Sequence, residues 1–164
     1  MNLNKIITTL SFLLLLSCGY EPIYSTKQIN SNYNFSINTI NYIGDSKANK
    51  ILKNKLKKIL ENEKKSTELN LNIDSRIEKV VTSKNKKGDP LGFLIKIIIN
   101  LEVYESEILK SKANFEEKFE YNNKSNKFDL RKYEKNIKNN LISKLSDKII
   151  RYLNSLGWYL KHLK

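Results

Sequence analysis

Cationic side chains around residues 84–87 are the group best suited to bind an anion. The segment 83–92 also contains glycine and proline, which are strong turn formers, so one loop would present several flexible ammonium groups together. Charged donors make the stronger hydrogen bonds to phosphate oxygens. The candidate anion-binding residues are Arg76, Lys79, Lys84, Lys86 and Lys87. A turn whose lysines only meet water is the alternative interpretation.

Catalytic chemistry has few candidates in this sequence. Glu116 and Glu117 are paired carboxylates, but neighbouring residues of a strand point to opposite faces and cannot serve one site. His162 is the single histidine, and the five glycines are scattered rather than gathered in a phosphate-binding loop. We therefore expect no catalytic residues, no cofactor-binding residues and no metal ligands, hence no enzyme. A periplasmic hydrolase, the disfavoured alternative, would need carboxylates that converge in a cleft.

The first seventeen residues have the pattern of a signal peptide. One lysine, Lys5, precedes the largely apolar run 6–16. Eleven residues rise about 16 Å in a helix, roughly half of a bilayer core, which suits the apolar region of a signal peptide better than a membrane span. We expect residues 1–17 to be removed.

The only cysteine of the chain lies where this apolar run ends. Leu15, the small Ser17 and Cys18 resemble the bacterial lipobox, in which the thiol forms a thioether with diacylglycerol. Cys18 would then begin the mature chain and carry two or three acyl chains such as palmitate, which hold a protein on a membrane permanently. Gly19, in place of the aspartate that retains lipoproteins in the inner membrane, predicts transport to the outer membrane of a Gram-negative cell. The alternative is an ordinary secretory signal with an accidental cysteine.

The composition fits one globular domain, and its positive charge is weak evidence for a nucleic-acid partner. The chain has 164 residues, 40% of them hydrophobic, and a formal net charge of +13. Of the 30 cationic residues 27 are lysine, and asparagine is also abundant, which indicates a compositional bias of the genome. Together with the export signal, this bias argues against a nucleic-acid partner.

Hydrophobic periodicity predicts a strand, a helix, three strands and a second helix. Alternating apolar residues place the strands, and a spacing of three to four places the helices. We expect strands at 33–43, 69–82, 93–103 and 109–121, and helices at 47–65 and 129–156. Gly44, Asp45 and Ser46 would form a turn and helix cap, and Gly157 would end the last helix.

This order predicts an α+β fold, a two-layer sandwich of about four mostly antiparallel strands with two helices on one face. Residues 33–164 form a single domain, and residues 18–32 form its lipid-anchored tether. Leu94 and Ile98 lie on the other face of the third strand. They indicate either partial cover of that face or chance filling by abundant isoleucine.

The segment Cys18-Gly19-Tyr20-Glu21-Pro22-Ile23-Tyr24 resembles the mature N-terminus of the alphaproteobacterial LPS-assembly lipoprotein LptE family. The element order and domain size are similar as well, although the last helix has more Lys and Asn than is typical. The resemblance implies a non-enzymatic lipoprotein on the periplasmic side of the outer membrane. Such a protein plugs the LptD-type β-barrel, supports its assembly and binds lipopolysaccharide. A different outer-membrane lipoprotein, acting as envelope chaperone or structural module, is the alternative.

Overall fold

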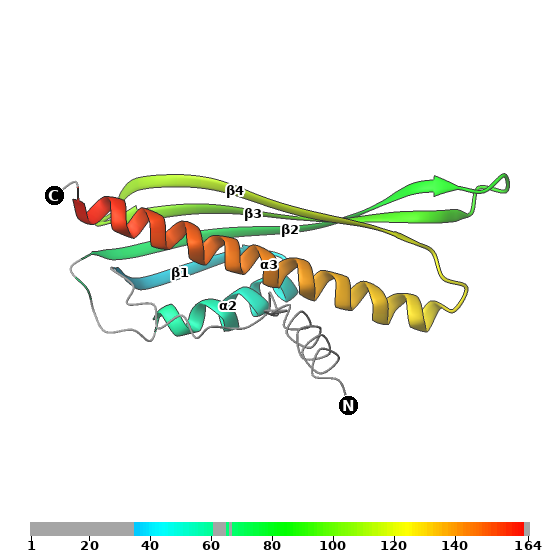
Figure 1. The fold of residues 1–164 in the computed structure, drawn as a ribbon, viewed down its shortest axis with the longest axis horizontal. Coiled ribbons are helices and arrows are strands. Elements are labelled where there is room, and N and C mark those ends of the chain that lie inside the picture. The colour runs from blue at the N-terminus through cyan, green and yellow to red at the C-terminus, as the bar shows by residue number, and fades with distance from the viewer. Residues whose placement is uncertain (1–34, 61–64, 66, 163–164) are drawn as a thin grey trace, which may run out of the picture. The chain divides into compact units, whose positions relative to one another are not determined.

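The computed structural model describes residues 35–60, 65 and 67–162. The expected signal peptide, Cys18 and the tether lie outside these residues. In the described part of the chain the elements follow the predicted order (Figure 1). They are β1 Ser36–Gly44, α2 Ser46–Leu60, β2 Glu68–Lys84, β3 Pro90–Glu105, β4 Ile108–Asn122 and α3 Lys127–His162.

The strands form a mixed sheet in the order β1-β2-β3-β4, with β1 parallel to β2 and the other pairs antiparallel. Figure 1 shows both helices on the same face of this sheet. The α+β two-layer fold is therefore confirmed. A parallel first pair follows from the chain path, because α2 carries the chain back before β2 begins.

Alternate residues of the strands bury their side chains beneath the two helices. On β3 the buried series is Ile95, Ile97, Ile99, Leu101 and Val103. These side chains belong to the same core cluster as buried leucines and isoleucines of α2 and α3. Each fully buried side chain of this size contributes roughly 1.5–3 kcal/mol.

Residues 44–46 form the expected helix start. Gly44 has a φ of 91°, and a Cβ there would lie 2.0 Å from the Ser75 carbonyl oxygen, so only glycine fits. An Oδ1 atom of Asp45 accepts hydrogen bonds from the amides of Lys47 and Ala48, each at 2.9 Å. Asp45 is therefore the N-cap.

The loop predicted at 83–92 is shorter than expected. β2 continues to Lys84, and β3 already begins at Pro90. Proline is tolerated there because the first residue of a strand can lack an amide hydrogen bond. The turn-forming residue types therefore predicted too long a loop, and residues 85–89 connect β2 to β3.

The expectation that Gly157 ends the last helix is wrong, because α3 continues through it to His162. Gly157 is buried, and a Cβ there would lie 2.4 Å from Cδ1 of Phe35. The glycine is needed for a close approach between α3 and the residue that precedes β1, not for a left-handed cap.

Candidate functional site

Asn85 organises the turn between β2 and β3. Its Oδ1 accepts hydrogen bonds from the amides of Lys87 and Asp89, both at 2.9 Å, and its Nδ2 donates to Oδ2 of Asp89 at 2.9 Å. Gly88 completes the turn with a φ of 88° and donates its amide to the Asn85 carbonyl. The Asn85 side chain therefore both holds the turn and binds Asp89, the single carboxylate of residues 85–89.

The three lysines of this turn are presented together to solvent. Lys84, Lys86 and Lys87 are exposed, and within the described residues their ammonium groups have no hydrogen bond or ion pair. Asp89, the carboxylate of the turn, is bonded to Asn85 and forms no ion pair with these lysines. The predicted cluster of these three lysines is physically able to receive an anion.

Exposed apolar side chains lie beside the lysines, on the strands that lead into the turn. Val80, Val81 and Leu91 are 40–51% exposed. Val80 and Val81 are neighbours in β2 and point to opposite faces of the sheet, so apolar side chains are exposed on both faces near the turn. Lysines next to apolar side chains suit a ligand that has both anionic groups and hydrocarbon.

The structure separates Arg76 and Lys79 from the lysines of the turn and from each other. Nζ of Lys79 lies 2.6 Å from Oε1 of Glu134 on α3 and 4.0 Å from the centre of the Phe93 ring. Arg76 is exposed eight residues before Lys84, which is about 26 Å along a strand. Lys79 therefore holds α3 on the sheet, and Arg76 stands apart.

A further lysine, Lys124, was not predicted from the sequence but belongs to this end of the sheet. Asn123 is hydrogen-bonded to the start of β3. Its backbone amide donates to the Leu91 carbonyl at 2.8 Å, and its Nδ2 donates to the Pro90 carbonyl at 2.7 Å. Lys124 follows and lies 4.2 Å from the centre of the Tyr133 ring. Only the tertiary hydrogen bonds of Asn123 reveal this proximity.

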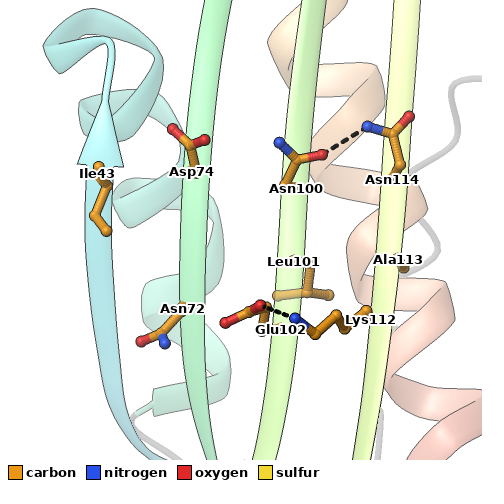
Figure 2. A pocket seen from close by; sticks show the side chains of 9 residues that line it. All are labelled: Ile43, Asn72, Asp74, Asn100, Leu101, Glu102, Lys112, Ala113 and Asn114. Carbon is orange, nitrogen blue, oxygen red and sulfur yellow. Dashed lines mark hydrogen bonds and ion pairs between the residues drawn. The ribbon is translucent and has the colours of Figure 1, made fainter.

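The sheet face opposite the helices carries an open hollow of about 600 Å³ (Figure 2). Oδ1 of Asn100 accepts from Nδ2 of Asn114 at 2.7 Å, and Nζ of Lys112 lies 2.6 Å from a Glu102 carboxylate oxygen. The hydrogen bond from Lys112, and then that from the Tyr104 hydroxyl, lowers the pKa of Glu102 to about 2. A carboxylate held ionised in this way is unsuited to proton transfer near neutral pH.

The adjacent carboxylates on β4 do not converge, as predicted. Glu116 pairs with Lys96 at 3.0 Å. Glu117 instead meets Lys144 at 2.8 Å and Lys148 at 2.5 Å, on the face that carries α3. Among the described residues, no group of three or more His, Cys, Asp or Glu side chains could hold a metal ion. No described helix is long and apolar enough to cross a membrane.

Solved structures of two bacterial lipoproteins are among those similar to this fold. The rare lipoprotein B from Shewanella oneidensis matches with a TM-score of 0.59 and 13% identity over 76% of this chain and 100% of that one. A minor lipoprotein from Acinetobacter baumannii matches with a TM-score of 0.54 and 12% identity over 75% of this chain and 92% of that one. No family model and no curated protein matches the sequence. At these identities the comparison shows that the chain has the fold of these two lipoproteins.

Proposed function

We propose that this chain is an outer-membrane lipoprotein of the LptE type. It is anchored through acylated Cys18, binds lipopolysaccharide, and supports the assembly and plugging of an LptD-type barrel. The fold shared with two lipoproteins supports this proposal, as does the motif that starts at Cys18. The role is binding and support, without catalysis.

The observation that carries the proposal is the turn at 85–89 and its surroundings. Lys84, Lys86 and Lys87 are exposed without an acidic partner in the described chain, and exposed apolar side chains lie beside them. Lipopolysaccharide offers phosphates and carboxylates for the ammonium groups and acyl chains for the apolar surface. Neither a sugar nor a simple phosphate would use both parts of this surface.

The turn lies far from the point where the chain enters the described domain. The 17 residues of β2 span about 55 Å at 3.3 Å per residue. The chain enters the domain near the start of β2, since Ser36 pairs with Glu68, and the lysines lie at its far end. The lysines of the turn therefore lie at the opposite end of β2 from the point where the described domain begins.

The test is purification of the mature protein from its native membrane, followed by identification of whatever remains bound. We expect one large outer-membrane β-barrel protein in stoichiometric amount, together with lipopolysaccharide. Depletion of the lipoprotein should lower the amount of correctly folded barrel, because a bound plug stabilises the assembled form by mass action. Recovery without a barrel, and barrel levels unchanged after depletion, would support an envelope chaperone or structural module instead.

A further inference from the structure

The chain enters the described domain at the end where α3 stops. Phe35 precedes β1 directly and packs against Gly157, five residues before the end of α3. Figure 1 shows the start of β1, the start of β4 and the end of α3 at this same end of the sheet. Sixteen residues separate Cys18 from Phe35 in the sequence. Phe35, the first described residue, therefore lies beside the last turns of α3.

Four large apolar side chains are exposed at this end. Trp158 and Tyr159 are each 56% exposed, while Ile108 is 62% and Leu109 is 42% exposed. A hydrogen bond between the hydroxyls of Ser111 and Tyr152 ties the beginning of β4 to α3 and brings both groups to the same end. We name Ile108, Leu109, Trp158 and Tyr159 the aromatic end.

Both basic and acidic side chains lie around the aromatic end. The sequence contains no acidic residue after Asp147, and exposed Lys161 and His162 lie in the last turn of α3. The His162 ring stacks on Trp158 with 4.3 Å between ring centres. On the β3–β4 turn, Glu105 is paired with Lys110, which leaves exposed Glu107 as the nearby carboxylate. Trp and Tyr beside cations are the side chains that favour the interface between membrane and water.

We propose that the aromatic end lies against the phospholipid headgroups of the leaflet that holds the acyl chains of Cys18. This inference rests on the lipidation included in the proposed function. An anchored domain is kept at a high effective concentration near its own membrane, so four partly inserted side chains suffice for contact. The contact fixes the orientation of the domain: β2 leads away from the headgroups of that leaflet, and Lys84, Lys86 and Lys87 lie at or just beyond its far end.

The chain contains a single tryptophan, Trp158, which reports on this contact directly. The experiment uses the mature acylated protein in vesicles of phosphatidylethanolamine and phosphatidylglycerol, with and without phospholipids that carry bromine near the headgroup. We expect the emission of Trp158 to move to shorter wavelength and the brominated lipids to quench it roughly twofold. Acrylamide dissolved in the water should quench the emission of Trp158 less in the vesicle-bound protein than in the unacylated protein in detergent-free solution.

The matched control moves the tryptophan to the other end of the same helix. Phe128 is 66% exposed in the first turn of α3, so the double variant Phe128→Trp with Trp158→Phe keeps an exposed tryptophan away from the proposed contact. Circular dichroism verifies that the variant is folded, and brominated lipids should leave its emission unchanged. Equal quenching of both proteins would overturn the inference.

The remaining outcomes separate the inference from the proposed function. If the wild type floats with the vesicles but Trp158 is not quenched by brominated lipid, the anchor stands and the contact is disproved. If Trp158 becomes shielded from acrylamide only after a β-barrel partner is added, the aromatic end binds protein rather than lipid, and the inference is wrong. A protein that does not float at all overturns both the anchor and the contact.

Discussion

Glu116 and Glu117 are neighbours in the sequence, yet the alternation of the strand gives them different partners. Lys96, on the neighbouring strand, meets Glu116. Two lysines of α3 meet Glu117, whose side chain is only 10% exposed. Burial alone would raise the pKa of Glu117, but hydrogen bonds from Lys144 and Lys148 outweigh burial and hold this pKa below its ordinary value. The ionised form therefore stabilises the packing of α3 on β4.

We expect Glu117→Gln to lower the free energy of unfolding at pH 7 by about 1 kcal/mol, because two lysines lose their charged acceptor. A folded-state pKa that is depressed contributes stability above the unfolded-state pKa of about 4.3. This contribution disappears as the pH falls through the folded-state pKa. Urea unfolding at pH 7 and at decreasing pH measures the difference from wild type. Glu116→Gln is the control, and an equal loss in both variants would contradict the buried role of Glu117.

Gly157 lies inside a helix at a position where the nearby Phe35 ring leaves no room for a side chain. Alanine is the better helix former by about 1 kcal/mol. A Cβ at this position would nevertheless lie 2.4 Å from Phe35 Cδ1, so the ring or the helix must move.

We expect Gly157→Ala to destabilise the protein by about 1–3 kcal/mol, as overpacking does. Thermal unfolding measures the loss, and Ser155→Ala, at an exposed position of the same helix, is the control. In a Phe35→Leu background the added methyl group should cost less. Increased stability of Gly157→Ala would mean that the close approach to Phe35 is absent.

At the scale of elements, the turn 85–89 and the helix α3 are held by asparagines in different ways. Asn85 bonds only within its turn, which lies beyond the core. Asn126 accepts hydrogen bonds from the amides of Phe128 at 2.9 Å and Asp129 at 3.4 Å, and so caps α3, which covers the core.

We therefore expect Asn85→Ala to open the turn without unfolding the domain. Amide hydrogen exchange at Lys87 and Asp89 should become faster, while the thermal midpoint stays near that of wild type. Asn126→Ala should instead lower the global free energy of unfolding by about 1 kcal/mol, as the loss of a helix cap does. Unchanged exchange at Lys87 and Asp89 in Asn85→Ala would show that the backbone alone holds the turn.

Most helices and strands could be predicted from the sequence, because the side of each element that packs into the core must be apolar, and this sets the spacing of its apolar residues. The series Ile95, Ile97 and Ile99 is buried as its alternation indicates. What failed depended on tertiary contacts: Gly157 looks like a stop unless the position of Phe35 is known. Similarly, the basic residues 84–87 were found as a cluster, but the ion pair of Lys79 with Glu134 joins positions 55 residues apart and has no local signal.

At the scale of the whole molecule, the proposal depends on Cys18 as the anchor. We expect the mature protein to begin at Cys18 and to carry acyl chains, so Cys18→Ser should accumulate as an uncleaved or mislocalised precursor. Ser17→Ala keeps a small residue before the cysteine and is the control that should be processed normally. Mass spectrometry of the purified chain decides the question, and an intact, unmodified Cys18 would remove the anchor.

The exposed lysines on α2 provide a matched control for the binding surface. Lys50, Lys53 and Lys55 are as exposed as the lysines of the turn, and within the described residues they also have no partner. Replacing either triplet by serine removes the same charge from the molecule. A difference between the two triple variants therefore reports the location of binding and not the net charge of the protein.

The most direct test of lipopolysaccharide binding at the turn is a titration of the wild type and both triple variants with purified lipopolysaccharide. We predict that replacing Lys84, Lys86 and Lys87 weakens binding about tenfold or more at low salt, equivalent to about 1.4 kcal/mol. The α2 variant should bind nearly as well as wild type. The difference should shrink as the Debye length falls from about 10 Å at 0.1 M to about 3 Å at 1 M salt. Equal binding by all three folded proteins at low salt, or an equal loss in both variants, would contradict the proposal.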